Sequence, residues 1–326
     1  MTTFFRKLRA RHFALLPMVL MFALDAVAAY PDKPVKMVVP FPAGGTVDVV
    51  ARALAVTMGS ALATSVVVEN VPGAGGAVAA QRVVKSPADG YTLHFTTPNH
   101  TINPALNARL GFDTEKDLLP ISMVAEIPEL LVANASQPFT SFEGFVKYAK
   151  DNPDKLNYSS AGNGTLPHIT MELLLQQLGL KVLHVPYKGA APAMNDLLGG
   201  QVQLKMDTIA TSSQHIKSGK LKPLAIASLK RSSLMPQVPT VAESGLAGYQ
   251  GILWMGLLAP AGTPRDVIDA VHRAVVQAIR DPELLKRFDA DGVVPVGNNP
   301  AEFEKLISTE IRQWADVVRK ANIKAD

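Results

Sequence analysis

The sequence predicts a two-lobed α/β fold with a mostly parallel sheet in each lobe. Short β-branched segments alternate with helical periods along most of the chain, which is typical of parallel sheets covered by helices. The alternation comes in two runs, one before Pro120 and one after it, and a helix-rich tail begins after Gly251. A chain of this length is expected to form more than one domain.

The first run predicts a βαβαβ unit. Its expected strands and helices are strand 35–39, helix 47–62, strand 65–68, helix 77–84 and strand 91–96. The first helix places Val47, Val50, Leu54, Met58 and Leu62 on one face, as a helix packed on a sheet requires. Residues 87–90 contain Pro, Asp and Gly, which are typical of a turn.

The second run predicts the other lobe, and the tail completes the chain. Expected strands are 130–133, 156–159, 183–185, 202–206 and 224–227, and expected helices are 142–150, 166–178, 191–198, 265–280, 282–288 and 301–320. In the last helix an apolar stripe comprises Phe303, Leu306, Ile307, Ile311, Trp314 and Val318. We expect residues 30–130 plus 252–326 to form the first lobe and 131–251 the second, with the tail returning to the first lobe.

The first 29 residues predict a cleavable secretory signal. Four basic residues precede an apolar run from Phe13 to Leu24, and Ala28 and Ala29 supply a small-residue exit. The apolar run is shorter than the roughly 20 residues that span a bilayer, although a single membrane anchor is the alternative. The chain has no Cys, which excludes a lipoprotein anchor and disulfides. We expect release into the periplasm.

The charge balance gives no indication of a nucleic-acid partner. Residues 1–29 hold four of the 32 Lys and Arg and one of the 28 Asp and Glu, so the remainder carries 28 basic against 27 acidic residues. The apparent basicity therefore belongs mostly to the export signal.

A Gly-rich loop between the first strand and the first helix is the first candidate binding site. Open parallel sheets bind ligands at the carboxyl ends of their strands, and a helix N-terminus favours an anion. The alternative is a tight turn with Thr46 as the N-cap and an Asp48–Arg52 pair in the first turns. The candidate residues are Pro42, Ala43, Gly44, Gly45 and Thr46.

A second Gly-rich loop repeats this design in the other lobe. It follows strand 156–159 and opens helix 166–178, with Thr165 as the expected N-cap and Pro167 near the first helical position. Two such loops would offer two sets of backbone donors to one anion. The candidate residues are Ser160, Ala161, Gly162, Asn163, Thr165 and His168.

Other strand ends supply weaker candidates. Thr97 follows the third strand, and Asp207 closes strand 202–206, where it would meet an ammonium or hydroxyl group of a ligand or simply be solvated. Segments 71–76 and 184–189 are either ligand contacts or surface turns.

Catalytic patterns are missing from the sequence. Its seven His show no metal-binding spacing, and there is no Gly-x-Ser-x-Gly elbow. We therefore expect no enzyme activity, no metal and no cofactor; an enzyme acting on a carboxylic acid is the remote alternative.

Several motifs, in order, resemble the tripartite tricarboxylate transporter substrate-binding proteins, or Bug family. They lie at 41–45, 68–76, 87–93, 156–165, 184–189, 238–243 and 258–264. The resemblance implies a type II, Venus-flytrap periplasmic binding protein that holds a carboxylate through backbone amides and bridging waters. It implies delivery to a two-component membrane permease, and we expect a monomer. A sensor that presents its ligand to a membrane kinase is the alternative role.

Two residues depart from the pattern of that family. Val47 replaces a hydroxyl-bearing residue, so the far end of the ligand is expected to be less polar. Lys205 stands where an apolar residue is usual. Facing the interlobe space, Lys205 would pair with a second carboxylate and favour a diacid, which is the interpretation we prefer; facing solvent, it would carry no meaning for binding.

Overall fold

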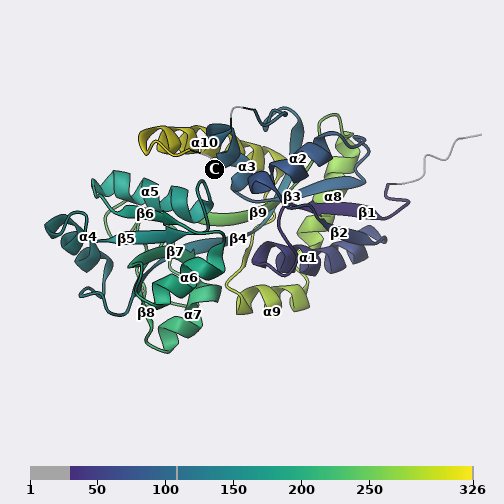
Figure 1. Cartoon of the computed structure of the whole chain (residues 1–326). Helices are drawn as coiled ribbons and strands as arrows, with labels where there is room; N and C mark the ends of the chain where they lie inside the picture. Colours follow the sequence, from purple (N-terminus) through teal and green to yellow (C-terminus); the bar gives the residue numbers. More distant parts are fainter. Residues whose placement is uncertain (1–29, 108, 325–326) are drawn as a thin grey trace, which may run out of the picture.

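One long strand, β4 (Leu118–Asn134), passes through the middle of the molecule and belongs to both lobes (Figure 1). The computed structural model describes residues 30–107 and 109–324, so the predicted signal segment 1–29 lies outside the described residues. Up to Pro128, β4 pairs with the strands of the first lobe, and from Glu129 onward it pairs with those of the second. Its antiparallel partners are β9 (Ile252–Pro260) and β10 (Val294–Pro295), then β7 (Leu204–Thr208) and β8 (Leu221–Ile226).

Parallel pairing is confined to the outer strands. In the first lobe β1 (Val35–Val39) lies between β2 (Val66–Asn70) and β3 (Thr92–Thr96). In the second lobe β5 (Asn157–Ser160) lies between β6 (Leu183–Pro186) and β7. The two-lobed α/β fold is thus confirmed, and the strands that cross between lobes add antiparallel pairs to each sheet.

The sequence predicted only 130–133 of β4 and missed β9. Pro120, Pro128 and two glutamates interrupt the apolar pattern of β4, and Pro supplies no N–H to a strand ladder. The ladder between β4 and β9 accommodates this through register shifts between Pro120 and Ser122 and between Met123 and Ala125. Tertiary pairing therefore overrides a weak local strand signal.

Helices cover both faces of each sheet, as the periodicity predicted. In the first lobe one face is covered by α1 (Thr46–Leu62), α8 (Arg265–Ala278) and α9 (Pro282–Ala290), and the other by α2 (Ala77–Val84) and part of α10 (Pro300–Lys320). In the second lobe α4 (Phe142–Asp151) and α5 (Leu166–Leu178) lie opposite α6 (Ala190–Leu198) and α7 (Ile209–Lys217). All five predicted core residues of α1 are buried.

Two short elements follow strands that end near the middle of the molecule. They are the 3₁₀ turn η1 (Ala74–Gly76) and helix α3 (Asn99–Leu106). The sequence did not predict α3, which contains Pro104.

Helix α10 lies against both lobes. A capping box between Asn299 and Glu302 starts it. Its first half packs Phe303 into a core cluster of the first lobe, and its second half packs Trp314 into the main cluster of the second. Figure 1 shows its yellow end above α5. Of the predicted tail, α8, α9 and the part of α10 before Glu310 pack on the first lobe, whereas the rest of α10 packs on the second.

Within residues 30–107 and 109–324, no helix is both long enough and apolar enough to cross a membrane.

Candidate functional site

The strand directions bring the carboxyl ends of both parallel groups to facing edges. Strands β3 and β4 are both antiparallel to β9, so β1 to β3 run in the same sense as β4, toward the second lobe. Strands β5 to β7 run in the opposite sense, because β7 is antiparallel to β4. The loops after β1, β3, β5 and β7 therefore lie at two edges that face each other. All the predicted binding residues are in or next to these loops.

A buried carboxylate shapes the loop after β1. Asp48, 2% exposed, accepts hydrogen bonds from Gly44 N at 2.8 Å, Arg52 Nε at 3.0 Å and Asn70 Nδ2 at 2.8 Å. Burial alone would raise the pKa of Asp48, but these three donors outweigh burial and hold the pKa below its usual value. Asn70 also donates to Phe41 O at 2.9 Å. The loop is therefore fixed from beneath, while residues 42–46 are exposed.

The start of α1 presents backbone donors without a side-chain cap. Gly45, not Thr46, is the N-cap, and among the described residues no side chain caps this helix end. The expectation that Thr46 is the cap is wrong: Thr46 is already the first helical residue. Glycine has no side chain to accept hydrogen bonds from the N–H groups of the first turn. These N–H groups are therefore suited to bind an anion, which the helix dipole also favours.

The loop after β5 is held by two stacked imidazoles. His168 and His184 stack with their ring centroids 3.7 Å apart. His168 Nδ1 accepts a hydrogen bond from Gly164 N at 3.0 Å, and His184 Nε2 lies 2.7 Å from Ser160 Oγ. Burial, and then the neighbouring His184, lower the pKa of His168 to about 3, so its ring is neutral at pH 7. His168, 4% exposed, thus supports the loop from below.

Thr165 occupies the N-cap position of α5, as predicted, but its hydroxyl donates to Gly162 O at 2.8 Å instead of capping the helix. Ser160 Oγ also donates to Gly162 O, at 3.0 Å. The carbonyl of Gly162 is thereby occupied from within the loop, and Thr165 N also donates to it at 3.3 Å.

Thr97, directly after β3, has a buried hydroxyl with no hydrogen-bond partner among the described residues. Its side chain is 1% exposed. A buried hydroxyl without a partner is costly. A ligand oxygen or an ordered water at the facing edges would remove that cost.

Lys205 and Asp207 pair with each other inside the second lobe. Lys205 Nζ donates to Asp207 Oδ1 at 2.7 Å, and the two side chains are 2% and 8% exposed. Asp207 Oδ2 accepts from Thr211 Oγ1 at 2.8 Å and from Ser212 Oγ at 2.7 Å. The expectation that Lys205 is available to a second ligand carboxylate is wrong, because Asp207 neutralises it. Asp207 in turn has both oxygens occupied.

Sequence reasoning missed three residues that shape the site. Asn70 lies in the motif at 68–76 and His184 in the motif at 184–189, but the sequence pattern assigned neither residue a role of its own. Leu106, at the end of α3, lies against the second loop: a Cβ on Gly164 would meet Leu106 Cδ1 at 2.1 Å. No local signal predicted these contacts, since each one joins segments far apart in the chain.

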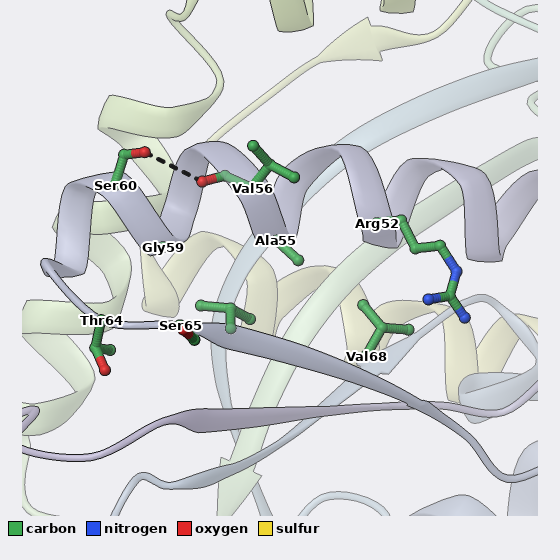
Figure 2. Close-up of a pocket in the computed structure, with 9 residues that line it drawn as sticks. Arg52, Ala55, Val56, Gly59, Ser60, Thr64, Ser65 and Val68 are labelled. Carbon is green, nitrogen blue, oxygen red and sulfur yellow. Dashed lines mark hydrogen bonds between the residues drawn. The ribbon is translucent and has the colours of Figure 1, made fainter.

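A cavity of about 560 Å³ lies away from the facing edges. Figure 2 shows it as an open groove between α1 and the edge strand β2, with Val56 and Val68 on opposite walls. Arg52 borders the groove and donates to Asp48 and Asn70. The groove thus adjoins the support of the first loop and does not contain the predicted binding residues.

The residues that the structure describes contain no group of three or more His, Asp or Glu arranged to hold a metal ion.

Comparisons with known proteins place the chain among transport receptors. Residues 50–323 match the model of the tripartite tricarboxylate transporter family receptor. The periplasmic binding protein BugD is 37% identical, with a TM-score of 0.77, over 91% of this chain and 100% of that one. A Rhodopseudomonas palustris protein solved with adipate is 33% identical, with a TM-score of 0.79, over 90% and 99%. MatC from Rhodopseudomonas palustris, with bound malate, is 34% identical, with a TM-score of 0.75, over 89% and 100%.

Proposed function

The chain belongs to the tripartite tricarboxylate transporter receptor family, and from this premise we propose that it is a periplasmic solute-binding protein for a small organic carboxylate. The ligand class is a di- or tricarboxylate, an acidic amino acid or an aromatic acid. The observation that carries the proposal is the pair of helix starts, α1 and α5, at facing sheet edges. The adipate and malate bound by two similar proteins support the same class.

The first carboxylate of the ligand would bind at the start of α1. Backbone N–H groups of residues 45 and 46 and bridging waters would hold its oxygens. The unpaired Thr97 hydroxyl follows β3, the strand paired with β1, and would lie near the same carboxylate. The loop with Ser160, Ala161, Gly162, Asn163 and Thr165 would close over the ligand from the second lobe. Because Asp207 neutralises Lys205, a second carboxylate would also depend on backbone and hydroxyl donors.

The role that follows is capture and delivery without catalysis. The ligand-loaded protein would act as a monomer and hand the carboxylate to a two-component membrane permease of the tripartite type, with no cofactor and no nucleic acid involved. The segment 1–29 would direct export and be removed. Presentation of the ligand to a membrane kinase is the second candidate role, and it uses the same two lobes.

A thermal-shift screen of the purified protein tests the ligand class. Adipate, malate, citrate, glutamate and benzoate are each added in large excess, with glucose as the neutral control. A ligand that binds only the folded state at about 100 times its Kd adds about 2.7 kcal/mol of stability. For a chain of this size, that corresponds to a rise in Tm of about 5 °C.

We expect at least one carboxylate to raise Tm and glucose to leave it unchanged. A shift with glucose and none with any acid would contradict carboxylate binding. Recovery of a chemically altered acid after incubation with the protein would contradict the non-catalytic role.

A further inference from the structure

Helix α10 is a third connection between the lobes, beside strands β4 and β9. Phe303 packs against Trp254 of β9 in the first lobe, with ring centroids 5.3 Å apart. At the other end of the helix, Val317 O accepts a hydrogen bond from Gln176 Nε2 of α5 at 3.2 Å. Trp314, Val317 and Val318 belong to the main core cluster of the second lobe. The lobes therefore cannot change their angle without disturbing one of these contacts.

A buried carboxylate lies where α10 passes from one lobe to the other. Glu310, 8% exposed, accepts a hydrogen bond from Thr101 Oγ1 at 2.7 Å. Trp254 Nε1 lies 3.0 Å from both of its oxygens, and Trp314 Nε1 lies 3.4 Å from Oε2. These are the only two tryptophans of the chain, and both depend on one carboxylate as their acceptor.

Helix α3 connects Glu310 to the loops of the proposed binding site. Thr101 is on α3, which begins two residues after Thr97 and is one of the elements most closely packed on α10. At the far end of α3, Leu106 occupies the space where Gly164 has no side chain. Helix α3 thus stands between a strand end of the first lobe and the binding loop of the second.

We propose that Glu310 is a positioning residue that holds α3 and α10 in place between the lobes, and so sets the interlobe angle and the affinity of a site that it does not touch. The affinity part rests on the proposed function; the angle does not. A merely stabilising Glu310 would change Tm and leave both the angle and the relative affinities unaltered.

The interlobe angle is measured without ligand. Because the chain has no Cys, Val56→Cys on α1 and Leu183→Cys on β6 supply two unique label sites, 72% and 68% exposed, one on each lobe. Double electron–electron resonance then gives the distance distribution between two spin labels. We compare the labelled parent with Glu310→Gln, Thr101→Val and the control Ser308→Ala. Ser308 is also on α10, but its hydroxyl donates to Glu115, in the segment before β4.

Glu310→Gln keeps the side-chain volume but turns one acceptor into an NH₂ group that cannot accept from an indole. We expect a broadened or shifted distance distribution for Glu310→Gln, a smaller change in the same direction for Thr101→Val, and none for Ser308→Ala. Thr101→Val removes the hydroxyl that bonds Glu310 and Pro98 O but leaves the carboxylate, so it serves if Glu310→Gln folds poorly. Unchanged distributions in both variants would overturn the proposal.

Ligand affinity is measured on the same proteins by calorimetry with adipate and malate. Where the parent binds either acid, Glu310→Gln should weaken binding about five- to tenfold, with no change for Ser308→Ala. Equal affinity in parent and variant would contradict the coupling. A parent that binds neither acid would count against the proposed function, while the distance measurement would still decide the role of Glu310.

Discussion

At the scale of single residues, buried groups beneath the two loops shape the candidate site. Asp48 accepts a hydrogen bond from the amide of Gly44, and His168 accepts one from the amide of Gly164. Each loop is therefore held in shape in part by one buried acceptor beneath it. The same loops depend on glycine where the backbone is left-handed, since Gly44 has φ +87°.

Gly44→Ala should weaken carboxylate binding, and Gly219→Ala should not. Both glycines have positive φ, +87° and +71°, and both have open space where a Cβ would stand. The strain of a left-handed alanine is therefore similar in the two variants, about 1 kcal/mol, and only Gly44 lies at the proposed site. We expect about tenfold weaker binding for Gly44→Ala by calorimetry.

Equal affinities in the two variants, at equal Tm, would show that the start of α1 does not hold the anion. A loss of affinity in Gly219→Ala as well would indicate that strain alone is the cause.

At the scale of elements, the contact of one glycine shows how closely β9 and α10 pack. A Cβ on Gly256 of β9 would lie 2.3 Å from Phe303 Cζ. The ring of Phe303 thus lies directly on the strand backbone. The capping box that starts α10 sets the point at which this ring meets β9.

Gly256→Ala should lower the free energy of unfolding by about 1–3 kcal/mol, because overpacking displaces the ring. Phe303→Leu, which removes part of the ring, should relieve most of that cost, so the double variant should be little less stable than Phe303→Leu alone. Chemical denaturation of the four proteins measures the coupling. Additive losses would contradict direct contact between the two residues.

The elements themselves were largely predictable. Helices 77–84 and 166–178 were predicted with the bounds that the structure has, because their apolar periods are long and clear. Strand β9, helix α3 and the first part of β4 were not predicted. Prolines or mixed composition weaken the local signal of these segments, and their structure depends on partners far away in the chain.

At the scale of the whole molecule, buried titratable groups link stability to pH, and three His and two Glu of the described residues have the clearest shifts. Burial lowers the pKa of His94 to about 4, and burial followed by the charge of His94 lowers the pKa of His100 to about 3; His168 behaves alike. Burial raises the pKa of Glu129 and of Glu310 to about 7.

These shifts act in opposite directions. Below pH 6.5 the unfolded chain protonates its His while the folded chain does not, so the three His make stability fall as pH decreases. The two Glu retain protons in the folded state up to about pH 7, so their contribution is present below pH 4.5 and is lost as pH rises to 7. Between pH 4.5 and 6.5 the two Glu offset two of the three His, so stability falls only gently as pH decreases. Below pH 4.5 the His act without that offset, and stability falls more steeply.

Melting curves should therefore show a weak dependence of Tm on pH from 4.5 to 6.5 and a steep loss below 4.5. His94→Leu removes one of the three His, and it also removes a buried Nδ1 that has no partner among the described residues. The variant should lose less Tm than the parent between pH 6 and 4. An identical pH profile in parent and variant would contradict burial of a neutral His94.

The sequence by itself determined the α/β class, the two runs of strands and helices, and the two Gly-rich helix starts, because these are written in local periods and turn residues. Only the tertiary structure decided that β4 pairs with strands of both lobes, that α10 packs on both, and that Lys205 forms an ion pair with Asp207. The physical reason is the range of the interactions: a helical period repeats within a few residues, whereas the partner of a buried charge or of a crossing strand is chosen by the packing of the whole chain.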